Sequence, residues 1–275
     1  MLKKIIYFLT LTIIILVSGI VYSDARLDSI YKKALAKEAN KGKAIAITQD
    51  EMDIGYGSQD AKMIMVLINA QGEEINREMI SERIEVNDDN YSDYSRIEFK
   101  KPSDVSGTKL LTHERKTGSD DQWLYLPAMN RIKRISSDNK SGSFMGSEFS
   151  YEDLGSREVE KYKYKYIRDT KLNGIDCFLV ERYPLERSSG YTKMVSWVRK
   201  DNYQAIKIDF YDRKREHLKT LHLKDYKQYK GKFWRALTLE MENLQTGKKT
   251  KLKMVNLNIG GSLNKSKFYM RALGK

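Results

Sequence analysis

From Lys62 onward, apolar and polar residues alternate with a period of two along most of the chain. The clearest example is residues 161–166, which read Lys-Tyr-Lys-Tyr-Lys-Tyr. Because successive side chains of a β-strand point to opposite faces, this segment predicts a half-buried strand with one tyrosine face and one lysine face. Basic and aromatic residues that bind nucleic acid share a face, so the segment argues against nucleic acid as a partner. Further strands are predicted at residues 63–68, 74–86, 95–100, 109–116, 122–126, 158–168, 176–183, 192–199, 204–211, 218–226, 236–244 and 249–259.

Glycine and proline separate these strands at roughly the 8–12-residue spacing that is typical of antiparallel sandwiches and barrels. No helical segment lies between them, which argues against a parallel sheet with crossover helices. One helix is predicted before the strands begin, and Asn40 and Gly42 are expected to end it. Residues 41–61 read as a weak, glycine-containing connector, and residues 264–273 predict a last short helix. The helix face is carried by Leu27, Ile30, Tyr31, Ala34 and Leu35.

The first residues predict export. Lys3 and Lys4 precede an apolar run over residues 5–21, and Val21-Tyr22-Ser23 resembles a cleavage site. The alternative is an uncleaved anchor, but the run is shorter than the ~20 residues that a spanning helix needs. We therefore predict a signal peptide at residues 1–23, an N-terminal helix and connector at 24–61, and a β domain at 62–275.

Net charge is the next constraint. The chain carries +13, and removing Lys3 and Lys4 with the signal peptide leaves 13 − 2 = +11. Such a charge favours anionic partners, which for an exported protein means anionic lipid surfaces. The alternative is that solvated strand faces alone account for the charge.

Residues 136–156 interrupt the strand pattern. They are rich in serine and glycine, yet they include Phe144, Met145, Phe149 and Tyr151. Ser150 and Asp153 are placed to cap a short helical turn. We consider two interpretations: a gate at the rim of a concavity, and a fixed loop whose aromatic residues complete the core.

No pattern in the sequence supports a catalytic or metal-binding site. Ser29 to Lys32, Ser137 to Asn139 and Lys116 to Gly118 match the three short motifs of penicillin-recognising enzymes, but they occur in the wrong order and in an all-β sequence. His217 and His222 are five residues apart, which places them on opposite faces of a strand. Cys177 is the single cysteine, and a buried apolar role is expected for it. We predict no enzyme activity, no metal and no cofactor.

A long segment resembles a known family. It reads Gln-Trp-Leu-Tyr-Leu-Pro-Ala-Met-Asn-Arg-Ile-Lys-Arg-Ile-Ser over residues 122–136, and Gly-Ser-Phe-Met-Gly-Ser-Glu-Phe-Ser-Tyr-Glu-Asp-Leu over 142–154. Supporting pieces lie at residues 99–102, 107–108, 191–200 and 268–273. The chain resembles the LolA-like outer-membrane lipoprotein-sorting proteins over roughly residues 60–273.

The resemblance implies an all-β fold with accessory helices: a half-open antiparallel barrel of the LolA/LolB type, wrapped around one or more helices. It also implies a periplasmic, non-catalytic carrier that binds acyl chains of lipids or lipoproteins in an apolar concavity, for transfer towards the outer membrane. The alternative is a periplasmic adaptor that docks on an RND-type exporter without holding cargo. An RND-type exporter or an inner-membrane transporter is the expected protein partner.

Methionine and aromatic residues suit such a concavity, because each exposed methylene group of a lipid costs about 0.8 kcal/mol in water. Met63 and Met65 share one face of a predicted strand, and Trp123 and Tyr125 share a face of another. Contact with an anionic headgroup or a membrane surface is expected at Arg131, Lys133 and Arg134. The expected ligand-binding residues are Met63, Met65, Trp123, Tyr125, Phe144, Met145, Phe149 and Tyr151.

The signal peptide can be tested by intact-mass measurement of protein released from the periplasm of a Gram-negative host. We expect a chain that starts at Asp24 or within a few residues of it. Full-length protein in the inner-membrane fraction would show that the segment is an anchor instead.

Overall fold

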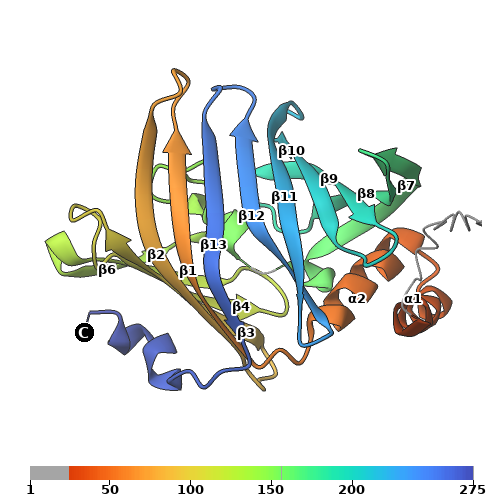
Figure 1. The fold of residues 1–275 in the computed structure, drawn as a ribbon, viewed down its shortest axis with the longest axis horizontal. Helices are drawn as coiled ribbons and strands as arrows, with labels where there is room; N and C mark the ends of the chain where they lie inside the picture. Colours follow the sequence, from red (N-terminus) through yellow and green to blue (C-terminus); the bar gives the residue numbers. More distant parts are fainter. Residues whose placement is uncertain (1–24, 156, 275) are drawn as a thin grey trace, which may run out of the picture.

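One antiparallel sheet of 13 strands carries the fold (Figure 1). The computed structural model describes residues 25–155 and 157–274, so the predicted signal peptide at 1–23 lies outside the described residues. The strands follow the order β6-β5-β4-β3-β2-β1-β13-β12-β11-β10-β9-β8-β7. Their bounds are β1 Ser58–Ile68, β2 Glu74–Glu85, β3 Tyr91–Lys101, β4 Lys109–Arg115, β5 Asp121–Leu126, β6 Arg131–Ile135, β7 Tyr162–Leu172, β8 Ile175–Pro184, β9 Tyr191–Arg199, β10 Ala205–Asp212, β11 His217–Tyr229, β12 Phe233–Asn243 and β13 Lys249–Ile259.

This order describes two meanders that meet in the middle of the sheet. β1 to β6 form one meander and β7 to β13 form the other, and the antiparallel pairing of β1 with β13 joins them. β6 and β7 lie at the two edges and do not pair, so the sheet curves without closing. The predicted half-open, all-β barrel with accessory helices is confirmed.

The topology also determines where residues 136–161 run. This segment leaves β6 at one edge of the sheet and enters β7 at the other, so it must cross the open side of the half-barrel. Three short 3-10 turns break its course, at Ser137–Asn139, Glu152–Leu154 and Val159–Lys161. We call residues 136–161 the crossing segment.

The crossing segment is fixed to the inner face of the sheet. Phe144 is fully buried and lies 5.6 Å from Phe99 of β3, measured between ring centroids. The backbone amide of Phe144 donates to the Phe149 carbonyl at 2.8 Å, and Ser150 and Asp153 cap each other at 2.7 and 3.2 Å. In this conformation Phe144 and Phe149 complete the core, as the fixed-loop interpretation expects, and opening of the segment as a gate stays a prediction.

The inner core itself follows the period-two pattern. Met63 and Met65 of β1 face Met79 of β2 and Leu252 of β13 across the strands, and all four are buried. Tyr162, Tyr164 and Tyr166 of β7 are half buried while the lysines between them are exposed, as the alternation predicts.

Two helices precede the sheet. α1 spans Ala25–Lys37, as its periodicity predicts, and α2 spans Lys41–Asp53 in the stretch read as a connector. Asn40 begins α2 instead of ending α1, because its side chain accepts from the Lys43 amide at 3.1 Å. Gly42 is needed for packing: a Cβ atom at this position would lie 2.8 Å from the backbone nitrogen of Tyr166. The sequence pattern did not reveal α2 because Gly42 reads as the end of a helix, whereas this glycine lets α2 pack closely against β7.

The C-terminal segment covers the outer face near β4 and β5. It forms two 3-10 turns, Lys265–Phe268 and Met270–Ala272, where one short helix was expected. Phe268 and Leu273 are fully buried against Leu111. A further 3-10 turn at Pro127–Met129 joins β5 to β6. Within residues 25–155 and 157–274, no helix has the length and apolar character needed to cross a membrane.

The core position of Phe144 gives a stability prediction. Phe144→Ala should lower the free energy of unfolding by about 3–5 kcal/mol, because Phe144 is fully buried and its loss leaves an empty cavity in the core. Ile75→Ala is the control, since Ile75 is 57% exposed and its loss should cost less than about 1 kcal/mol. Denaturant unfolding measures both. An effect of Phe144→Ala as small as that of the control would contradict the core assignment.

Candidate functional site

A cavity of 1270 Å³ lies beside the inner core, between α2 and the inner faces of β7 to β10, and it reaches the ends of β2 and β3. Its volume exceeds the ~300–1,000 Å³ of ordinary small-molecule pockets. Residues 153–155 and 157–160 of the crossing segment form one of its walls. The cavity is therefore the part of the half-barrel's concavity that the crossing segment leaves unfilled.

Small side chains explain why this region stays open. Ala46 of α2, Ser196 of β9 and Ala205 of β10 all line the cavity. Methionine and phenylalanine fill much of the inner core, which Ala205 also borders. The apolar wall is completed by Ile45, Tyr164, Val180, Val198 and Ile208.

Charged groups line the opposite wall. Arg83 of β2 bridges the carboxylates of Asp93 and Glu114, with nitrogen–oxygen distances of 2.6 Å to each. Burial raises the pKa of Glu114 well above its usual range, and the nearby Asp93 charge adds to the rise although Arg83 opposes it. Asp50 of α2 also faces the cavity, and burial together with the charge of Glu158 raises its pKa to about 6.

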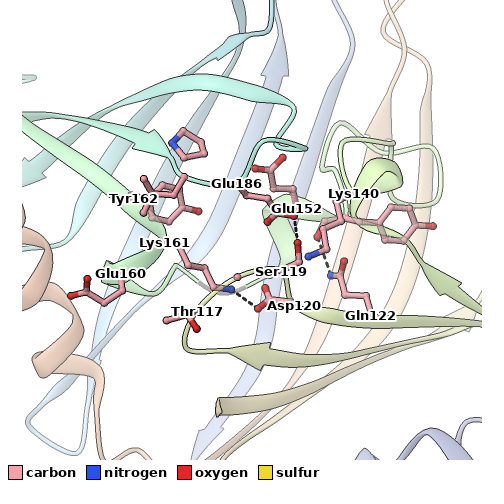
Figure 2. A pocket seen from close by; sticks show the side chains of 15 residues that line it. Thr117, Ser119, Asp120, Gln122, Lys140, Glu152, Glu160, Lys161, Tyr162 and Glu186 are labelled. Atoms are coloured by element: carbon pink, nitrogen blue, oxygen red, sulfur yellow. Dashed lines mark hydrogen bonds and ion pairs between the residues drawn. The ribbon is translucent and has the colours of Figure 1, made fainter. Parts of the chain in front are cut away.

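A second cavity of 410 Å³ lies on the other side of the crossing segment (Figure 2). It is polar: Lys161 pairs with Asp120 at 2.5 Å, and the Glu152 carboxylate accepts from the Gly190 amide at 2.9 Å and from the Ser189 hydroxyl. Burial lowers the pKa of Lys140 at its edge. These bonds tie the crossing segment to the turn before β5 and to the turn before β9, which is a structural role.

The structure places the expected ligand-binding residues in two groups on opposite faces of the sheet. Six lie on the inner face: Met63, Met65, Phe144 and Phe149 are buried in the inner core, and Met145 and Tyr151 pack against it. Trp123 and Tyr125 lie on the outer face, under the C-terminal segment. Tyr151 borders the smaller cavity, and none of the eight lines the larger one.

The three expected headgroup contacts lie together on the edge strand β6. Arg131, Lys133 and Arg134 are exposed there, and Arg134 also pairs with Asp121 at 2.6 Å. The exposed side chains of Met129 and Ile132 lie among them.

The sequence reasoning missed the residues that line the larger cavity, including Arg157 and Arg182. One signal was available: Arg182 is in phase with Phe178 and Val180, which predicts an inward-pointing arginine on a strand. Cys177 is buried, as expected. Across residues 25–155 and 157–274, no three His, Cys, Asp or Glu side chains are grouped to hold a metal ion.

Comparison with solved structures gives close matches over nearly the whole described chain. A candidate outer membrane lipoprotein-sorting protein domain from Vibrio parahaemolyticus is 47% identical, with a TM-score of 0.82 over 86% of this chain and 99% of that one. A DUF1329 family protein from Desulfovibrio piger is 30% identical, with a TM-score of 0.80 over 84% and 97%. A LolA superfamily protein from Nitrosomonas europaea, 19% identical with a TM-score of 0.64 over 89% and 98%, shares the fold.

A family model described as "uncharacterized protein"-like matches residues 91–275, and comparison with curated proteins found no match. The half-open sheet, the strand order and the 47% identity to a sorting-protein domain agree with the motifs at residues 122–154. The chain belongs to the family of LolA-like outer-membrane lipoprotein-sorting proteins.

Proposed function

We propose that this protein is a non-catalytic periplasmic carrier that holds acyl chains of lipids or lipoproteins in the 1270 Å³ cavity, for transfer towards the outer membrane. The observation that supports the proposal is the cavity itself, which is preformed and bounded on one side by the apolar residues of α2 and β7 to β10. Membership of a lipoprotein-sorting family and the export signal expected at residues 1–23 agree with this function and compartment.

The free energy of binding expected for an acyl chain suits a carrier that must also release its cargo. The roughly fifteen methylene groups of a fatty-acyl chain contribute about 12 kcal/mol when they are removed from water. The cost of association, about 4 kcal/mol or more, is subtracted from that gain. The charged wall at Arg83 and Asp93 gains nothing from an alkyl chain. We therefore expect micromolar and not picomolar binding of single-chain lipids.

Ligand contact by Met63, Met65, Phe144 and Phe149 stays a prediction, and it requires the crossing segment to leave its place in the core. Trp123 and Tyr125 would need the C-terminal segment to move in the same way. Docking on an RND-type exporter or an inner-membrane transporter stays an expectation from the family resemblance alone.

A bulky residue in the cavity wall tests the proposal. Ser196→Phe should weaken binding of a pyrene-labelled fatty acid at least tenfold, because the new ring occupies space that the chain needs. The matched control is Lys165→Phe, which adds the same ring to the exposed face of β7 and should leave affinity unchanged. Fluorescence titration measures affinity, and a melting curve confirms that both variants are folded. Unchanged binding by Ser196→Phe, or equal loss in both variants, would reject the cavity as the acyl site.

We also propose that the β6 edge contacts anionic membranes during transfer, through Arg131 and Lys133 with Met129 beside them. Arg131→Glu combined with Lys133→Glu should reduce co-sedimentation with vesicles containing phosphatidylglycerol. The control is Lys163→Glu combined with Lys165→Glu, which makes the same charge change on the opposite edge strand, β7. If both pairs reduce binding equally, only the total charge matters and the β6 edge is no specific contact.

A further inference from the structure

Arg157 and Arg182 both line the larger cavity. Arg182 projects from the inner face of β8, in phase with Val180, and Arg157 projects from the crossing segment. Within residues 25–155 and 157–274, no carboxylate lies within 4 Å of either guanidinium group. Arg182 makes only weak contacts: its Nε lies 3.3 Å from Met194 Sδ, and its guanidinium carbon lies 5.2 Å from the centre of the Tyr162 ring.

The two arginines also repel each other. Loss of solvent lowers the pKa of Arg157, and the positive charge of Arg182 lowers it further. The charge of Asp153 raises the pKa of Arg157, but the Asp153 carboxylate is already bound to the Lys219 ammonium at 2.6 Å and to the Tyr191 hydroxyl at 2.8 Å. The Arg157 side chain is exposed and Arg182 is half-buried, so the two positive charges sit at the solvent-accessible lining of the cavity, where an anion between them would relieve their repulsion.

The other carboxylates of the cavity do not supply that anion. Asp93 pairs with Arg83, Asp53 pairs with Arg235, and Glu85 accepts two backbone amides at 2.6 Å. Burial raises the pKa of Asp50 and of Glu158, and the charges of neighbouring acids add to the rise: Glu158 acts on Asp50, and Asp93 acts on Glu158. Among the described residues, no carboxylate of the cavity therefore forms an ion pair with Arg157 or Arg182.

We infer that Arg157 and Arg182 form an anion-binding subsite, which takes the phosphate or carboxylate head of an amphiphile whose chain lies along Val180 and Val198. Planar guanidinium groups bind such oxyanions through paired hydrogen bonds, and the adjoining wall of the cavity is apolar. The cargo class is thus a single-chain anionic lipid or an anionic lipid moiety. The part of the inference that concerns the alkyl chain of the amphiphile rests on the proposed function. The anion site itself rests only on the two arginines.

The test compares two twelve-carbon probes that differ in the head: dodecyl phosphate, and the uncharged octaethylene glycol monododecyl ether. Inorganic phosphate is a third ligand without a chain. The variant is Arg157→Gln combined with Arg182→Gln in the full mature chain, and Arg168→Gln on β7 is the control. Calorimetry measures each affinity at low and at high salt. A lysine pair at positions 157 and 182 keeps the charge and should restore part of the binding.

We expect the wild type to bind dodecyl phosphate at least tenfold more tightly than the uncharged probe, with a preference that falls as salt rises. The double variant should lose this preference while its affinity for the uncharged probe and its melting temperature are maintained. A structural role for the arginines would instead lower the melting temperature and weaken both probes alike.

The outcomes separate the two proposals. Equal binding of both probes by the wild type, or an unchanged preference in the double variant, overturns the anion subsite and leaves the carrier in place. If inorganic phosphate binds through the arginines but neither twelve-carbon probe binds, the site takes free phosphate and the lipid carrier is wrong. If none of the three ligands binds, both proposals fail.

Discussion

The pairing of β1 with β13 is the constraint on which the rest of the structure depends. It joins two meanders of six and seven strands into one sheet, and its register runs from Gln59 opposite Ile259 to Ile68 opposite Lys249. Because each meander then ends at a free edge, the chain between β6 and β7 has to cross the concave side. The filled core around Phe144 and the open cavity beside it are both consequences of where that crossing runs.

Side-chain size divides the concavity into a filled half and an open half. One half is closed by methionine, phenylalanine and the crossing segment, which gives the molecule a core of its own. The other half keeps space because alanine and serine face α2. The open half is lined in part by Ala46 and Ser196, which lie outside the inner core cluster, so larger side chains at these two positions would narrow the cavity and not the inner core.

Most of the fold could be predicted from the sequence, because period-two alternation reports which face of a strand is buried. The exceptions have local causes: β6 is short and mostly basic, and α2 contains a glycine that serves packing against β7. The site was harder to predict. Large apolar residues such as Met65 and Phe149 identify core, whereas a cavity is defined by small residues on elements far apart in the sequence, and no periodicity reveals that Ala46 and Ser196 face the same space.

A sheet that does not close presents two rows of unpaired backbone groups, and such edges invite other strands to add on. Here both edges carry positive charge: Arg131, Lys133 and Arg134 on β6, and Lys163 and Lys165 on β7. When two molecules meet edge to edge, these side chains repel each other before backbone hydrogen bonds can form. The open architecture therefore carries its own protection against growing into fibres.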